Sequence, residues 1–507
     1  MNRAQRGSLA SHATLSLSAG VLSAVVTLAT LPYIVDGLGL AVYGLFALLS
    51  LASAYVGVLD LGFSWTTSRF VADALGREDH QMLDDVLGAS LVLYVVVGSF
   101  GGGVLALAAP VLVEDVFNVP PDLRRPGALA GQIFGLAFPA AMAQTYASAV
   151  LRGAQRFDLT AVLQAGTAMG TSAGLVAAVA AGAGIVGVTA TVAGVQCVAA
   201  ALGLAAARWV LPGALRFRRP KRRTLTLLGG FSAKVAVTNL GMQLLYLPNR
   251  LAVGILLPLA AVGNFTVPFA LAQRLQMVPA ALASAGLPTL TGATARGEAT
   301  AFKTTFWRLL AANGALLLPA TALVVVWAPT FLEIWFSSAL SENASMVLRI
   351  SVVAVLLNAG TSVLAVACDS AGKPEVPALA TAIAGIANVG LAFALTAAWG
   401  IVGSAVALLA SLGLLVGAII VLWRRHSLPR LDRPPFHPGP RLVAGGVLAI
   451  LIWGASAWFT EPIVDDRPSL VVWICVFVGT AYIGVGAAVG RDRLARLLPN
   501  REAGARE

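Results

Sequence analysis

Apolar runs of about twenty residues or more recur along most of this 507-residue chain, separated by short polar stretches. Each run is long enough to cross a hydrocarbon core of ~30 Å as an α-helix. Backbone polar groups in lipid must bond internally, so only helices or a closed barrel can span a membrane. The runs are continuous rather than alternating, which excludes a barrel. The sequence therefore predicts an all-α polytopic membrane protein.

We predict about fourteen transmembrane helices. The first apolar run, from about Ser8 to Val35, is too long for the apolar part of a signal peptide, so it is predicted to be the first span. The predicted spans lie at residues 8–35, 40–67, 86–113, 127–150, 158–181, 184–211, 226–256, 260–290, 304–336, 344–368, 375–398, 401–423, 441–459 and 469–490.

The charge pattern predicts the orientation. Of the 34 lysines and arginines, 27 fall on the side of the N-terminus in this map and four on the other. The positive-inside rule then places both termini in the cytoplasm. The net charge of +11 is thus interpreted as a topology signal, and no nucleic-acid partner is expected. For the basic run Arg216–Arg223 we favour a topology anchor over a docking patch for anionic lipid.

The chain contains an internal repeat. Gly184-Ile185-Val186-Gly187 recurs as Gly400-Ile401-Val402-Gly403, and Tyr43-Gly44 corresponds to Val262-Gly263. An even number of spans per half makes the repeats parallel, related by an axis along the membrane normal, with substrate between them. The predicted organisation is an N-lobe of helices 1–6 (1–213), a basic cytoplasmic linker (214–225), a C-lobe of helices 7–12 (226–424), a Pro/Arg-rich cytoplasmic linker (425–440), helices 13–14 (441–490) and a cytoplasmic tail (491–507).

No enzyme signature is present in the sequence. It has no glycine-rich phosphate loop or nucleophile elbow after a strand. The three cysteines are far apart and the four histidines do not cluster, so neither a metal site nor a disulfide framework is expected. We expect no enzyme activity, no cofactor and no bound metal.

Polar residues inside the spans are the candidate functional groups, because each is costly in lipid without a partner or water. Ser232, Asn239, Gln243, Tyr246 and Arg250 follow intervals of 7, 4, 3 and 4, which places them on one face of helix 7. Pro248 is predicted to kink this helix. Arg274, about midway along helix 8, should face the interior, since exposure to lipid would cost at least ~2.5 kcal/mol.

Further polar residues lie in helices 1, 2 and 10. Asp60 either faces a substrate cavity between the predicted helices or pairs with an arginine such as Arg69 or Arg152. Hydroxyl stripes in helices 1 and 10 can line a cavity or bond back to their own helices. The predicted substrate-binding residues are Arg250, Arg274, Asn239, Gln243, Tyr246 and Asp60. Arginines in a wet cavity suit a phosphate-bearing anion, which they bind bidentately.

Several segments resemble the polysaccharide transporter family, the Wzx-type O-antigen and capsule flippases of the MOP superfamily. In the first half these segments are Tyr43-Gly44-Leu45, Asp60-Leu61-Gly62, Arg69-Phe70-Val71-Ala72, and Leu151-Arg152-Gly153 through Arg156-Phe157. In the second half Asn249-Arg250, Val262-Gly263 and Pro288 are similar to the helix 7–8 pattern. The family often has Asp where this chain has Asn249. Related multidrug antiporters couple through acids deep in helices 1 or 7, and this chain has none there.

The resemblance implies a flippase that moves an undecaprenyl-pyrophosphate-linked oligosaccharide between leaflets. Membrane lipids, a polysaccharide polymerase and glycosyltransferases would be its partners. A proton or sodium gradient is an open possibility as the driving force. Three alternatives remain: a cation-coupled multidrug (MATE-like) antiporter, a lipid II flippase, and a membrane scaffold that transports nothing.

Overall fold

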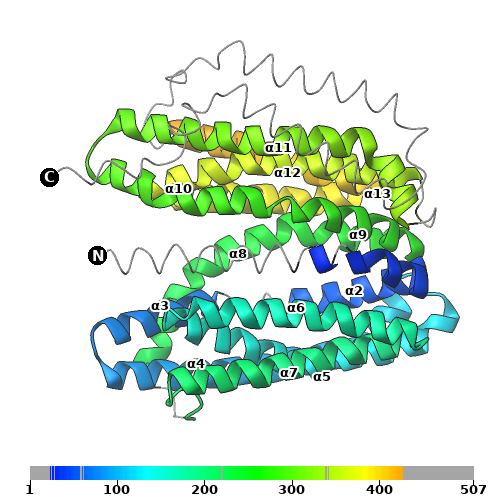
Figure 1. Ribbon diagram of the computed structural model, residues 1–507, viewed down its shortest axis with the longest axis horizontal. Coiled ribbons are helices and arrows are strands. Elements are labelled where there is room, and N and C mark those ends of the chain that lie inside the picture. The colour runs from blue at the N-terminus through cyan, green and yellow to red at the C-terminus, as the bar shows by residue number, and fades with distance from the viewer. Residues whose placement is uncertain are drawn as a thin grey trace. The chain divides into compact units, whose positions relative to one another are not determined.

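The computed structural model describes residues 23–425, apart from 24, 28, 58–59, 61, 218–220, 337–339 and 341. This part of the chain is almost entirely helical and contains no strand (Figure 1). It forms two compact units: the described residues up to Thr266 with Gly385–Ser404, and Val267–Ala384 with the described residues from Ala405 on. The predicted lobe boundaries stay a prediction. Predicted helices 13 and 14, the linker from residue 426 on and the tail lie outside the described residues.

Most predicted spans appear as helices of the expected length. Seven helices of the described chain are long and apolar enough to cross a membrane. They are α4 (His80–Val111, continued by the π-helical turn η2, Leu112–Val116), α5 (Pro121–Gly153), α6 (Phe157–Ala180), α7 (Ile185–Val210), α11 (Ala299–Phe336), α12 (Glu342–Ser370) and α13 (Glu375–Arg425). The polytopic all-α class is therefore confirmed, while the count of fourteen stays a prediction.

Two predicted spans are broken. The span expected at 40–67 is α2 (Leu40–Gly57) followed by α3 (Phe63–Gly76). The span expected at 260–290 is α9 (Leu259–Arg274) followed by α10 (Met277–Ala295). Before α3, Gly62 has φ +77°, a left-handed conformation that a right-handed helix cannot continue through. The prediction of a continuous span over 40–67 was wrong for this reason, and the one over 260–290 was wrong because Leu275 and Gln276 form a turn.

Two predicted boundaries are confirmed. α6 ends at Ala180 and α7 begins at Ile185, with Gly182 at φ +69° between them. Within α13, Trp399 and Gly400 have non-helical backbone angles, with Gly400 at φ +61°. The repeated Gly-Ile-Val-Gly segment thus follows a helix break in both copies.

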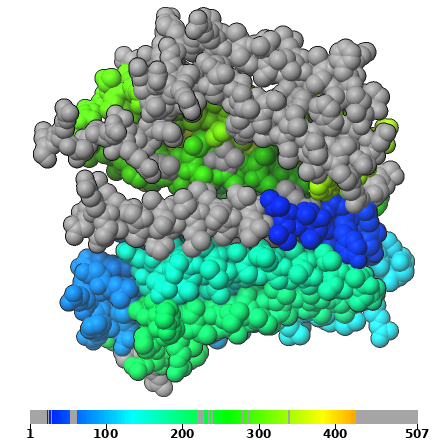
Figure 2. All heavy atoms as spheres, viewed as in Figure 1, coloured from blue at the N-terminus to red at the C-terminus, as the bar shows by residue number. Residues whose placement is uncertain are grey.

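The first unit packs its helices closely around α5. α5 contacts both α4 and α7, and α6 packs on α7 (Figure 1). Figure 2 shows α6 and α7 on the visible face of this unit. Tyr146 of α5 is fully buried at the centre of an apolar cluster that includes Leu87, Tyr94 and Val150. Gln144, also on α5, accepts a hydrogen bond from Gln196 and donates one to Thr167, so polar contacts join α5, α6 and α7.

α8 (Arg222–Leu256) belongs to the first unit and is one unbroken helix despite its internal Pro248. It packs against α2, α3 and α4. One face carries buried residues at regular spacing, among them Gly241, Leu245 and Ala252. A β-carbon on Gly385 of α13 would lie 2.6 Å from the Gly241 carbonyl oxygen, so the two helix backbones approach closely here.

Candidate functional site

The polar stripe of α8 lies on the face opposite its buried one. Asn239 is exposed, and Gln243, Tyr246 and Arg250 are partly exposed. Their spacing of 4, 3 and 4 residues keeps all four on one side of the helix. The structure therefore brings these four predicted residues together on an accessible face.

Ser232 is the exception in the stripe. It is buried, and its hydroxyl lies 2.7 Å from the Thr66 hydroxyl of α3. Thr66 also donates to the Gly62 carbonyl oxygen at 3.1 Å. Ser232 thus joins α8 to the start of α3, as hydroxyls often do between membrane helices.

Pro248 leaves a carbonyl group without its helical partner, because proline has no N–H to bond the residue four positions earlier. The freed group is the carbonyl of Leu244. The buried Asn388 of α13 donates its side-chain amide to the Leu244 and Leu245 carbonyl oxygens at 3.2 and 3.0 Å. The Ser404 hydroxyl donates to the Asn249 carbonyl at 2.9 Å. Side chains from α13 therefore satisfy the backbone of α8 beside Arg250.

Arg250 is partly exposed as a residue, but the Nε atom of its guanidinium is buried, and Tyr43 of α2 is an electrostatic neighbour. Tyr43 directly precedes Gly44, whose close packing against α9 holds this part of α2 in place. A guanidinium can bind a phosphate or carboxylate group through two parallel hydrogen bonds.

Asp60 sits in the joint between α2 and α3 and is held by three neighbours. Its carboxylate accepts hydrogen bonds from Tyr94 of α4 at 2.8 Å and from Ser64 at 3.0 Å. Arg152, at the end of α5, interacts electrostatically with both Asp60 and Tyr94. Of the two arginines that the sequence suggested, Arg152 is shown beside Asp60. This cluster favours a structural role for Asp60 over a place in the substrate path.

Arg274 lies about midway along the stretch that α9 and α10 cover together. It is the last residue of α9, at the break before α10, and it is partly exposed. Two residues on, Gln276 accepts a hydrogen bond from Asn358 of α12 at 2.7 Å, and Asn358 accepts one from Thr361 at 2.8 Å. Arg274 belongs to the second unit, whereas the other five predicted site residues belong to the first.

The hydroxyl stripes mostly bond to their own helices. Thr27 and Thr30 donate to the carbonyls of Ser23 and Val26, and Ser362 donates to that of Asn358. This is the local bonding expected of hydroxyls in helices. The first part of the polar stripe predicted in helix 1, which contains His12 and Ser16, lies outside the described residues.

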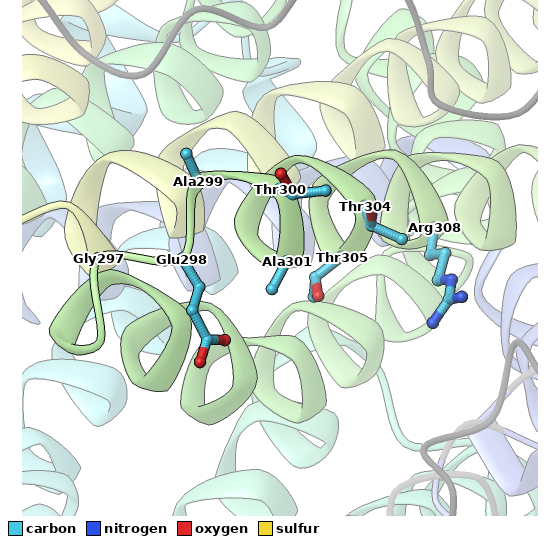
Figure 3. A pocket seen from close by; sticks show the side chains of 8 residues that line it. All are labelled: Gly297, Glu298, Ala299, Thr300, Ala301, Thr304, Thr305 and Arg308. Atoms are coloured by element: carbon cyan, nitrogen blue, oxygen red, sulfur yellow. The ribbon is translucent and has the colours of Figure 1, made fainter.

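A hollow of about 790 Å³ opens at the turn from α10 to α11 in the second unit. Figure 3 shows the hydroxyls of Thr300 and Thr304, with Arg308 further along the same helix. Glu298 is ion-paired with Arg296 at 2.7 Å, which holds the pKa of the Glu298 carboxyl below its usual value. None of the predicted site residues lines this hollow.

Long apolar helices, joints inside two of the spans and a polar face on α8 define a polytopic membrane protein. The chain belongs to the polysaccharide biosynthesis protein family, which it matches over residues 9–293. A Shigella flexneri protein named as an O-antigen transporter is 20% identical over 365 residues, 70% of this chain and 83% of that protein. The family and its relatives are transporters, so the expectation that this chain is not an enzyme is confirmed.

Solved structures of the MOP superfamily share the fold. A multidrug resistance MATE family transporter in an inward-facing conformation has a TM-score of 0.68 and 17% identity, covering 84% of this chain and 100% of that one. The lipid II flippase MurJ has a TM-score of 0.68 and 11% identity, covering 96% and 99%. A MOP superfamily transporter from Pyrococcus furiosus has a TM-score of 0.59 and 16% identity, covering 83% and 95%.

Proposed function

We propose that this protein is a flippase that moves a polyprenyl-pyrophosphate-linked oligosaccharide across the bacterial inner membrane by alternating access. Its family and its O-antigen transporter relative support transport for polysaccharide synthesis. A sugar–pyrophosphate head cannot cross hydrocarbon unaided, because each polar group would lose its water without a replacement partner. The polyprenyl tail can stay in lipid throughout.

The observation that carries this proposal is the accessible polar face of α8. Asn239, Gln243 and Tyr246 supply amide and hydroxyl groups that suit a sugar, and Arg250 supplies a cation beside them. Arg274 is proposed as a second cation for the pyrophosphate. Asp60 is part of the packing cluster with Tyr94 and is proposed to act only indirectly.

The membrane orientation and partners follow from the same proposal. Both termini would be cytoplasmic, so that the basic segments face the compartment where glycosyltransferases build the substrate. A polysaccharide polymerase on the other side would consume the product. A proton or sodium gradient is proposed as the energy source.

The test is deletion of the gene in the native host, followed by assays of surface polysaccharide and of lipid-linked oligosaccharide in each leaflet. We expect loss of the polymer, with precursor trapped on the cytoplasmic leaflet. Wild type should restore both, and Arg250→Gln/Arg274→Gln should not. The matched control Arg77→Gln/Arg296→Gln, which changes two exposed arginines, should restore both.

Other outcomes point to the alternatives. Unchanged polysaccharide with new sensitivity to cationic drugs would indicate the antiporter. Failure of peptidoglycan synthesis would indicate a lipid II flippase. Full complementation by Arg250→Gln/Arg274→Gln would refute the assigned site, and a scaffold role would gain support if substitutions along the whole α8 face also complemented.

A further inference from the structure

An apolar slot of about 300 Å³ lies among α4, α5 and α7 of the first unit, near the end of α7. Leu91 and Val95 of α4, Ala143 of α5, Leu204 of α7 and Phe217 help to line it. The slot is apolar although two tyrosine rings face it. The Tyr94 hydroxyl is bonded to Asp60, and the Tyr146 hydroxyl to the carbonyl of Ala214, so only the rings offer surface.

A second hollow, of about 610 Å³, lies beside the slot and is cationic. Arg208 and Trp209 at the end of α7 and Arg216 in the following turn line it. Leu215 lines both hollows, so they are neighbours. The guanidinium of Arg156 lies 5.2 Å from the centre of the Trp209 ring, which fixes that indole in place.

The turn that joins the two hollows is rigidly held. The buried Tyr146 donates to the Ala214 carbonyl oxygen at 2.6 Å. Within the turn, the Ala214 N–H donates to Leu211 and the Arg216 N–H to Gly213, at 2.9 and 3.0 Å. Arg216 is therefore presented on a fixed backbone, whose position depends on the α5 core.

Two of the basic residues around these hollows form ion pairs, and two arginines do not. Lys221 is paired with Asp85 at 2.7 Å, and Arg156 with Asp158 at 2.8 Å. Within the described part of the chain, Arg208 and Arg216 form no ion pair, and both are exposed. The hollow they line has no acidic residue, so its charge is complementary to an anion.

We infer that this paired hollow binds an anionic glycerophospholipid of the cytoplasmic leaflet. Its phosphate would contact Arg208 and Arg216, and one acyl chain would enter the apolar slot. The site lies at the end of a membrane-crossing helix beside an exposed tryptophan, which is typical of the bilayer interface. Basic pockets between helices on the cytoplasmic side suit anionic headgroups. A soluble anion would use the arginines but not the adjoining slot.

The test is native mass spectrometry of the full-length protein with added phosphatidylglycerol or phosphatidylcholine. We expect wild type to retain phosphatidylglycerol selectively. Arg208→Gln/Arg216→Gln should weaken that retention about tenfold or more, because each basic residue near an anionic headgroup contributes substantially to binding. The control Arg424→Gln/Arg425→Gln removes two exposed arginines of the second unit that line neither hollow, and it should retain the lipid.

A second variant tests the contribution of the apolar slot to lipid binding while leaving the arginines unchanged. Ala143→Phe should fill the slot and weaken phosphatidylglycerol binding, whereas Ala201→Phe, on an exposed part of α7, should not. Equal lipid retention by wild type and Arg208→Gln/Arg216→Gln would overturn the proposal. An equal loss of phosphatidylglycerol retention in Arg208→Gln/Arg216→Gln and Arg424→Gln/Arg425→Gln would also overturn the proposal, because it would show that general surface charge binds the lipid. Binding of a polyprenyl pyrophosphate in place of phosphatidylglycerol would also overturn it.

Discussion

The side-chain amide of Asn388 lies 3.2 Å from the carbonyl oxygen of Leu244, the group that Pro248 leaves without a helical donor. The two residues are 144 positions apart, and both belong to the first unit. A donor from α13 thus bonds the backbone group that the proline inside α8 leaves free, next to Arg250. The contact makes the local geometry of the proposed site depend on a residue outside α8.

We predict that Asn388→Leu lowers the free energy of unfolding by about 1–3 kcal/mol, because the partly buried Leu244 carbonyl loses its donor. Adding Pro248→Ala should recover much of this loss, since alanine at that position restores the helical N–H. The measurement is thermal unfolding of the purified protein in one detergent, with Ser284→Ala as an exposed control. A double variant no more stable than Asn388→Leu alone would contradict this explanation.

The crossing of α2 and α9 should not tolerate side chains. A β-carbon on Gly44 would lie 2.5 Å from the Leu259 carbonyl oxygen, and one on Gly263 would lie 2.8 Å from that of Leu40. We expect Gly44→Ala and Gly263→Ala each to destabilise the protein by about 1–3 kcal/mol through overpacking. Gly103→Ala, with open space around the added carbon, is the control and should not lower the melting temperature.

The pair formed by Asp60 and Tyr94 should act in folding rather than in substrate binding. In a double-mutant cycle with Asp60→Asn and Tyr94→Phe, we expect a coupling energy of about 0.5–3 kcal/mol, because the two groups share a hydrogen bond. Once protein amounts are matched, both single variants should transport at close to the wild-type rate. A much larger transport defect in Asp60→Asn would instead place the carboxylate in the transport path.

Arg250 should require its planar guanidinium and not only its charge. If it binds pyrophosphate, Arg250→Lys should transport at a rate between wild type and Arg250→Gln, since lysine keeps the charge but loses the bidentate geometry. We expect about a tenfold loss for lysine, equivalent to one lost hydrogen bond to a charged group. The assay is flipping of a fluorescent polyprenyl-pyrophosphate sugar in vesicles. Wild-type transport by Arg250→Gln would exclude this contact.

Much of the fold could be predicted from the sequence, because the length of a span and many helix breaks depend on residues that are close together in the chain. The helix breaks at Gly182, between α6 and α7, and at Trp399–Gly400, within α13, were predicted and are present. The accessible stripe on α8 also follows from spacing alone, since a helix fixes which residues share a face. The correspondence of Gly44 with Gly263 was visible as a repeated motif.

The remaining features depend on contacts between distant residues. The breaks at Gly62 and after Arg274 depend on backbone conformation inside otherwise apolar runs. Glycine after Asp60-Leu61 was a weak local signal for the first. No pattern connected Asn388 with Leu244, although an asparagine in an apolar helix opposite a proline-containing helix suggests such a role. Tyr94 was missed as a partner of Asp60 because it lies 34 residues away on another helix.

The crossing at Gly44 and Gly263 has a mechanical consequence. Gly44 and Gly263 occupy equivalent positions in the two repeats, and so do Leu40 and Leu259. Gly44 contacts the carbonyl oxygen of Leu259, and Gly263 contacts that of Leu40, so the two contacts are equivalent. A contact of this reciprocal kind has its own two-fold axis. The two backbones touch with no side chain between them, while side chains flank the contact on both helices. We therefore expect rotation of these two segments about the contact to be easier than sliding of one along the other.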